Sequence, residues 1–422
     1  MPLTSRLILF VLFIVVSTPV TAVAQSTPNV NWWRQTKEWT SRYYTIKTDL
    51  TPEEMRPYAR HLDRMYEEYR RRLGSLQPRE EEKLNILLFK RRVDYMHVLN
   101  VEYGIDASGS GGMFFVTRRG TAFALWLENL SRRRIDHVMQ HEGFHQFAHS
   151  RFGGDLPIWV NEGLAEFFGE SILVDDTFVL GQSTPRLLSR IQNAIEQETT
   201  IPFDALLAMT PQEWLRNVQQ GYAHIQYEQA WSMVQFLIYG EGGRYQKAFE
   251  RYLRKLNAAV PARAAWNEVF GPDVKPFEDA WKTFAMNSRP SAFMTALERA
   301  EFLAEGMMEL SRRGQQPKSL DELKRSLQEI GFEQQIQGHQ RMRLVKASDD
   351  ANYVIPSDDL STDAKFVMEE KRRRLSARQR RWEEQQPTPL ILRTEGLKPN
   401  GITVTWVRDR KTGALTYELE IK

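Results

Sequence analysis

The stretch "QHEGFHQFAHSRFGGDLPIWVNEGLAEFF", residues 140–168, gathers side chains that bind metal ions. It contains three histidines and three glutamates, and four of the eight histidines of the 422-residue chain lie within thirteen positions (His137, His141, His145 and His149). Its apolar pattern predicts one helix over residues 135–152 and a second helix beginning near Pro157. Gly153 and Gly154 are expected to make the turn between them.

The first helix is expected to present two metal ligands. His141 and His145 are four residues apart, so their Cβ atoms would lie about 5–6 Å apart on one face. Glu142 is rotated by about 100° from His141. Its carboxylate can therefore reach a water on the metal without binding the metal, and Glu142 is the candidate catalytic base.

A third ligand is expected from the second helix, because catalytic zinc has three protein ligands and one open position. Glu162 follows His145 after sixteen intervening residues and is the candidate. Glu166, one turn later, could accept a hydrogen bond from a ligand histidine and orient its ring. Two alternatives are the reverse assignment, with Glu166 as the ligand, and a surface position for both glutamates.

His137 and His149 extend the four-residue spacing in both directions. Successive positions at this spacing drift by about 40° around a helix, so all four histidines cannot face one ion. Neither His137 nor His149 is assigned a role, and His149 is expected to turn away from the site.

The motif "HEGFH…WVNEGLAEFF" resembles that of the gluzincin zinc metallopeptidases, the group that includes thermolysin and the aminopeptidase-N relatives. It is most similar to the short peptidase MA-like domain proteins of bacteria. The resemblance covers roughly residues 43–288 and is specific between His141 and Phe168. It implies a zincin-like fold, one Zn²⁺ per chain on His141, His145 and Glu162, and hydrolysis of a peptide or protein substrate. The spacing before Glu162 is slightly shorter than in the aminopeptidase-N relatives.

Two further comparisons with the aminopeptidase-N relatives bear on mechanism. "QYEQAW", residues 226–231, resembles the segment whose tyrosine stabilises the developing oxyanion, which implies that role for Tyr227. Tyr222 and His224 are nearby alternatives, and Tyr227 could instead be a packed aromatic residue. "GGMFF", residues 111–115, lacks the glutamate that grips a substrate amino terminus, so an endopeptidase, or a peptidase with another exo specificity, is favoured over an aminopeptidase.

The chain is predicted to have an α+β fold in two domains. Residues 30–290 would form the peptidase domain, with a small mixed sheet and the zinc helices to about residue 170 and a helical part over 171–290. The strand candidates are residues 42–50, 84–90 and two strands after a Gly/Ser turn, the first of them exposed. Residues 291–422 would form a small α+β domain of unknown role. It is expected to contain a helix capped by Ser319, a charged helix over residues 366–386 and two closing strands.

The first 24 residues have the pattern of a signal peptide, with a short apolar run and an Ala-x-Ala site, although an uncleaved anchor is an alternative. A bacterial protein that is periplasmic or secreted is therefore predicted, with no other membrane association. The chain has no cysteine, which excludes disulfides and thiolate ligands. Lys+Arg 57 nearly balances Asp+Glu 54, and the basic cluster at residues 371–374 is flanked by acids, so no nucleic-acid partner is predicted.

Two other functions compete with a zinc-dependent peptidase. One is a non-catalytic, zinc-bearing binding or scaffold protein of the envelope, and the other is a helical interaction protein without metal. The presence of Glu142 argues against a scaffold, because a structural zinc needs no general base and has a closed coordination shell.

Overall fold

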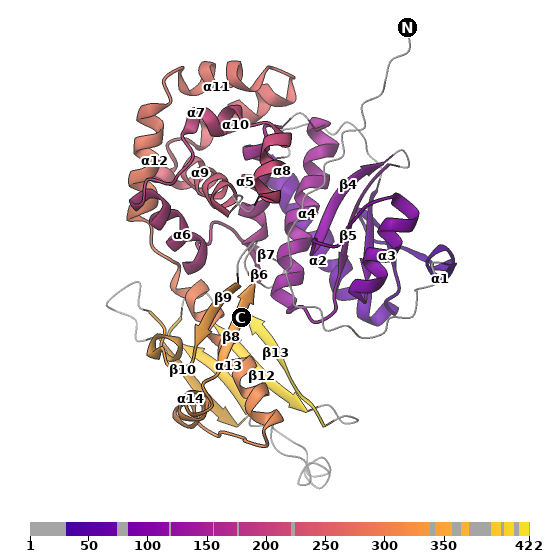
Figure 1. Cartoon of the computed structure of the whole chain (residues 1–422), viewed down its shortest axis with the longest axis vertical. Helices are drawn as coiled ribbons and strands as arrows, with labels where there is room; N and C mark the ends of the chain where they lie inside the picture. Colours follow the sequence, from indigo (N-terminus) through magenta and orange to yellow (C-terminus); the bar gives the residue numbers. More distant parts are fainter. Residues whose placement is uncertain are drawn as a thin grey trace. The chain divides into compact units, whose positions relative to one another are not determined.

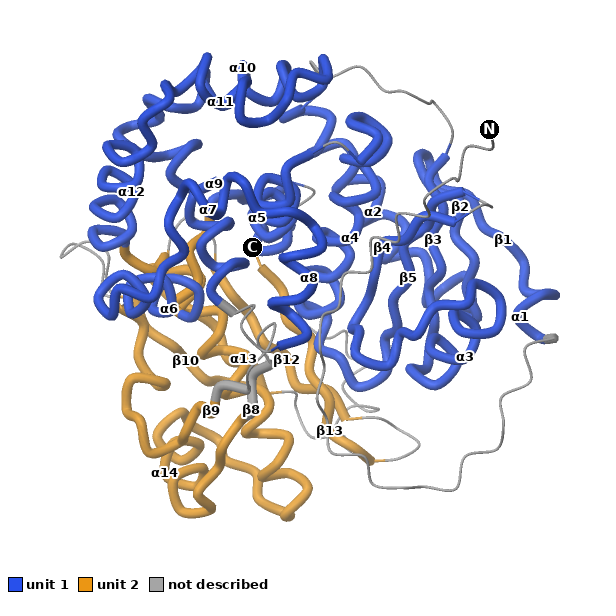
Figure 2. The backbone as a smooth tube through the Cα atoms, turned by 45° about the horizontal axis from the view of Figure 1, so that its top comes forward, with its two compact units in different colours: residues 1–181, 186–288 blue, residues 182–185, 289–422 orange. Residues whose placement is uncertain are grey.

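The computed structural model describes residues 31–73, 83–117, 120–154, 156–174, 177–220, 224–337, 342–356, 364–370, 390–397, 401–408 and 413–421. The fold is α+β. The chain divides into two compact units, one of Met1–Gly181 and Arg186–Ser288 and one of Gln182–Pro185 and Arg289–Lys422 (Figure 2). The predicted signal peptide, Tyr222 and the basic cluster at residues 371–374 lie outside the described residues.

The first unit contains a five-stranded sheet with the order β1-β2-β3-β5-β4. Strands β2, β3 and β5 are parallel, whereas β1 and β4 run antiparallel to their neighbours. The strands, with the short helix α1 (Asn31–Gln35) before them, are β1 (Glu38–Thr40), β2 (Tyr44–Thr48), β3 (Leu84–Phe89), β4 (Gly112–Thr117) and β5 (Gly120–Trp126). Strand β4 forms one edge of the sheet.

Helices cover both faces of this sheet (Figure 1). α2 (Pro52–Leu73) and α4 (Arg132–Phe152) lie on one face, and α3 (Arg92–Tyr103) lies on the other. Successive residues of β3 therefore enter two different cores, Ile86 the first and Leu87 the second. Burial on both faces explains the continuous apolar run of this strand.

Strand β4 is not the exposed strand that the sequence suggested. Met113 and Phe115 are buried in the core beneath α3, and Phe114 is buried in the core beneath α4. The prediction was wrong because it inferred the exposure of the strand from the Gly/Ser turn before it. The helices that cover the strand come from distant segments of the chain, which the turn does not reveal.

The remainder of the first unit is mainly helical, and α5 lies between α4 and α9. The expected helical part nevertheless begins with a β-hairpin, β6 and β7, which corrects the prediction for its first residues. The elements are α5 (Ile158–Gly169), β6 (Ile172–Val174), β7 (Thr177–Val179), α6 (Pro185–Glu196), α7 (Phe203–Ala208), α8 (Pro211–Gln219), α9 (His224–Gly243), α10 (Gln246–Asn257), α11 (Ala262–Phe270) and α12 (Lys275–Asn287). Helical geometry in α9 stops at Gly240.

The second unit packs α13 against an antiparallel sheet with the order β10-β11-β12-β13. The Trp406 indole N–H donates to the carbonyl oxygen of Ala304, 3.2 Å away, and ties β12 to α13. The elements are α13 (Ala292–Arg312), α14 (Leu320–Glu329), β8 (Glu333–Gln337), β9 (Met342–Lys346), a 3₁₀ helix (Asp350–Tyr353), β10 (Lys365–Glu370), β11 (Leu390–Glu395), β12 (Ile402–Arg408) and β13 (Leu415–Ile421). The Ser319 hydroxyl accepts from the Glu322 amide, which confirms the cap at Ser319, whereas the Glu322 carboxylate accepts from the Lys318 amide and not from that of Ser319, as a capping box would require.

The predicted charged helix over residues 366–386 is wrong at its start. Residues 366–370 belong to β10, where Phe366 is buried and pairs with Thr394 of β11. Cross-strand pairing outweighs the local helix preference of these residues. The rest of the predicted helix lies outside the described residues. Among the helices that the structure describes, none has the length and apolarity needed to cross a bilayer.

Candidate metal centre

The candidate site is built on two consecutive helices, α4 and α5. α4 begins at a Ser131 cap, whose hydroxyl accepts from the Arg134 amide, and ends at Gly153 in the left-handed conformation. That conformation favours glycine and allows the sharp turn toward α5. The side chains of the motif project into the buried interface between the two helices, so their polar atoms must be satisfied there.

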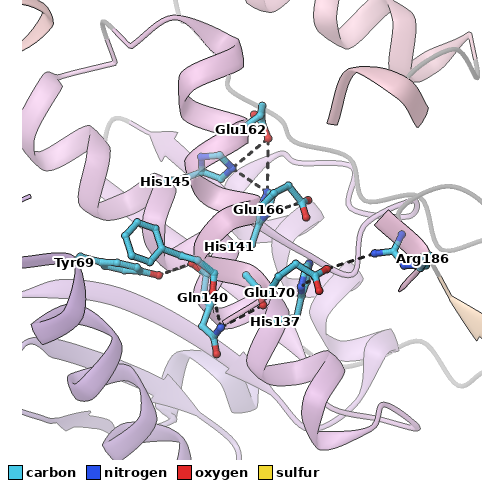
Figure 3. Close-up of polar contacts among 11 residues, drawn as sticks. Tyr69, His137, Gln140, His141, His145, Glu162, Glu166, Glu170 and Arg186 are labelled. Carbon is cyan, nitrogen blue, oxygen red and sulfur yellow. Dashed lines mark hydrogen bonds and ion pairs between the residues drawn. The ribbon is translucent and has the colours of Figure 1, made fainter. Parts of the chain in front are cut away.

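His141, His145 and Glu162 converge in this interface (Figure 3). The two histidine Nε2 atoms are 3.1 Å apart. Glu162 Oε2 lies 3.7 Å from Nε2 of His141 and 3.6 Å from Nε2 of His145. Two ligand atoms that bind zinc tetrahedrally through bonds of about 2.0–2.1 Å are about 3.3 Å apart. The three donors therefore fit one zinc ion.

Glu162 gives a second test of this fit. Its side chain is fully buried, and neither carboxylate oxygen forms a hydrogen bond with a residue that the structure describes. A buried carboxylate without such bonds is costly. A cation between Glu162 and the two imidazoles removes that cost, and a histidine and carboxylate donor set suits zinc.

Glu166 lies behind His141 rather than among the three donors. Its Oε1 is 3.3 Å from His141 Nδ1, on the opposite side of the ring from Glu162. Burial lowers the pKa of His141, but the hydrogen bond and charge of Glu166, with the charges of Glu142 and Glu162, raise it overall to about 9. A carboxylate in this position fixes the ring orientation of a ligand histidine.

His137 lies one turn before His141 and joins a second buried group of donors. His137, His141 and Glu166 also each place one donor atom within 4.8 Å of the others. The two groups share His141, which turns Nδ1 to Glu166 and Nε2 to Glu162. Nδ1 of His137 is 3.7 Å from Glu170, which pairs with Arg186 at 3.4 Å (Figure 3).

Glu142 lies between the metal ligands and the edge strand. Its Oε2 accepts a hydrogen bond of 2.7 Å from the backbone amide of Phe114 in β4. Its Oε1 forms no hydrogen bond with the described residues. Burial raises the pKa of Glu142, whereas the neighbouring charges of His141 and His145 lower it, with a net rise. One oxygen is thus held in place while the other remains able to take up a proton.

Tyr227 belongs to α9, and the packing of α9 against α5 brings it to the site. Gly163 makes that contact close, since a Cβ atom there would lie 2.5 Å from the carbonyl oxygen of Ala230. Tyr227, about one turn earlier on α9, is buried with its ring against Trp214. Burial and then the negative charge of Glu162 raise the pKa of Tyr227 well above its ordinary value, so the phenol keeps its proton. Tyr222 is outside the described residues, and the side chain of His224 is not described.

Gln140 is a site residue that the sequence analysis missed. Its Nε2 donates to the carbonyl oxygens of Phe168, in the last turn of α5, and Ser171, just after it, at 2.7 and 3.0 Å. Its Oε1 is 3.0 Å from His61 Nε2, and its carbonyl oxygen accepts from the Tyr69 hydroxyl. The first two bonds hold the end of α5 against α4, and the other two link α4 to α2. A polar residue directly before the first ligand, on a buried helix, was the available signal.

A cavity opens beside the metal ligands and was also missed. It encloses about 460 Å³, including the part that is open to solvent. Its lining comes from β4, the second half of α4, the turn and the start of α5: Phe114, His145, Ala148, His149, Phe152, Gly154, Leu156 and Asn161. His149 therefore does not turn away from the site altogether, because it borders the same cavity as His145.

A segment of the chain matches a protein family that has no assigned activity. Residues 136–262 match a family described as a protein of unknown function (DUF1570). The matched segment contains the histidines and glutamates of the candidate site, together with Tyr227. Among curated proteins, none matches the chain.

Proposed function

We propose that this chain is an exported bacterial zinc-dependent metallopeptidase with a zincin-like catalytic domain. The observation that carries the proposal is the buried convergence of His141, His145 and Glu162 with spacing that suits one zinc ion. Glu162 would be the third ligand because its oxygen faces both Nε2 atoms, and Glu166 would orient His141.

Glu142 is suited to the work of a general base. Zinc in such a site lowers the pKa of a bound water toward 7 and polarises a substrate carbonyl. The Phe114 amide holds one Glu142 oxygen, and the other would accept the proton of the attacking water and pass it to the leaving amine. A residue that only supported a structural metal would not need this arrangement.

Tyr227 would act on the other side of the reacting carbonyl. Its phenol keeps its proton at neutral pH because burial and Glu162 raise its pKa. It can therefore donate a hydrogen bond to the oxyanion as negative charge develops. Strand β4 carries no glutamate that would bind a substrate amino terminus, which supports endopeptidase action.

The test uses the full chain in metal analysis and in turnover of a peptide library, with and without a chelator. We expect one zinc per chain and cleavage that the chelator abolishes. Glu142→Gln should keep its zinc and lose turnover by at least about 100-fold. The control, Glu250→Gln on the exposed side of α10, should behave as the wild type.

Three other results would count against the proposal. Full activity of Glu142→Gln would remove its assigned role. One zinc per chain without any peptide cleavage would favour the non-catalytic scaffold, and absence of bound zinc would favour an interaction protein without metal.

A further inference from the structure

The cavity beside the metal ligands has a lining that selects for apolar groups. Its walls include Phe114, Ala148, Phe152 and Leu156, and no described residue that lines it is Asp, Glu, Lys or Arg. A charged group placed there would lose water without gaining an opposite charge from these residues. An apolar group would gain from the removal of its surface from water.

The cavity is also continuous with the reacting centre. His145 both lines it and places its Nε2 among the three metal donors. Phe114 lines it as well, and the amide of the same residue holds the catalytic base Glu142. A group in the cavity therefore lies next to both the metal position and the base.

The polar atoms at the cavity come from few side chains. Among the described side chains, His149 and Asn161 supply them apart from the ligand His145, and the His149 ring lies 5.6 Å from that of Phe114. A mainly apolar lining with a small number of polar groups is typical of sites that bind organic groups.

We propose that this cavity is a specificity subsite that binds a large apolar side chain of the substrate, next to the bond that is cleaved. The inference rests on the proposed peptidase function. It assigns substrate selection to Phe114, Ala148, Phe152 and Leu156, with Ala148 on α4 limiting the space next to the ligand His145.

The experiment measures binding without relying on turnover. The probes are acetylated amino-acid hydroxamates, which chelate zinc, in two series that place the side chain before or after the chelating group. In one series, the leucine and phenylalanine probes should bind the zinc-loaded full chain about 10- to 100-fold more tightly than the glycine probe. The aspartate probe should bind no better than glycine.

Two variants test the walls of the cavity. Ala148→Leu should reduce the advantage of leucine over glycine at least fivefold, and His149→Ala should favour phenylalanine over leucine. Zinc content and binding of the glycine probe show that each variant is folded, and selectivity is measured relative to the glycine probe within the same variant. Ala264→Leu, an exposed exchange on α11, is the control and should change nothing.

Equal affinity for all side chains, or a preference that neither variant alters, would overturn the inference. Peptide cleavage without any apolar preference would overturn it while leaving the proposed function intact. A side-chain preference in a chain that binds zinc but cleaves no peptide would support the cavity and refute the peptidase. A chain without zinc would refute both.

Discussion

Replacing Gly163 with alanine should disturb the metal centre by separating α5 from α9. The new Cβ atom would lie 2.5 Å from the Ala230 carbonyl oxygen and 2.8 Å from Val234 Cγ2. The nearer atom is helix backbone, which cannot rotate away as a side chain can. Glu162 directly precedes Gly163, so a shift of α5 at this point moves the candidate third ligand.

Two opposing free energies decide the size of the effect. Alanine favours a helix over glycine by about 0.5–1 kcal/mol. Overpacking a well-filled interior costs about 1–3 kcal/mol. The contact with backbone places Gly163→Ala toward the costly end, so we expect a net loss of up to about 2 kcal/mol in the free energy of unfolding. Zinc affinity should fall with it.

Gly143→Ala is the matched control, because it adds the same methyl group to the other helix of the motif. Its Cβ atom would meet Met65 Cε at 2.3 Å, the far end of a flexible side chain that can move. Urea unfolding and competition with a zinc chelator should therefore separate the two variants. If Gly163→Ala were as stable as Gly143→Ala and bound zinc equally well, the close helix contact would not position the site.

Four further results are expected. His145→Ala should lose its zinc in elemental analysis, since two donors remain. Glu166→Ala should keep zinc but bind it about 10- to 100-fold more weakly in chelator competition, because the His141 ring loses its partner. Gln140→Leu should lower the free energy of unfolding by about 1–3 kcal/mol in urea titration, because buried carbonyl groups and His61 lose hydrogen bonds. The pKa of His141 in the metal-free chain is raised from 6.5 to about 9, so the ring is protonated at neutral pH and zinc must displace that proton. Zinc affinity should therefore rise with pH until about 9, and calorimetry in buffers of different ionisation enthalpy should detect the released proton.

The elements with local signals were predictable. At the start of α2, Thr51 and Glu54 form a reciprocal cap, with hydrogen bonds of 3.3 and 3.0 Å, and such caps have a sequence signal of their own. The apolar run at β3 and the helices α4 and α5 lie where their patterns place them. Helix spacing likewise predicted that His141 and His145 lie side by side, because it depends on one helix alone.

The errors fall where partners distant in sequence decide the structure. β6 and β7 have three residues each, too few for a periodic pattern, and they pair with each other. β10 contains residues that favour a helix, yet each of its positions pairs with β11, twenty to thirty residues later. Composition within a short window cannot report such pairing.

His149 shows why the cavity could not be predicted from the spacing of the histidines in the sequence. Rotation along α4 correctly separates His149 from the three metal donors. The surroundings of the His149 ring depend on other elements, because Phe114 of β4 and Asn161 of α5 line the same cavity. One turn of α4 thus presents His145 to the metal position and Ala148 and His149 to the cavity. A substitution at Ala148 can therefore alter substrate selection while His145 keeps its place, whereas a change that tilts α4 would alter both together.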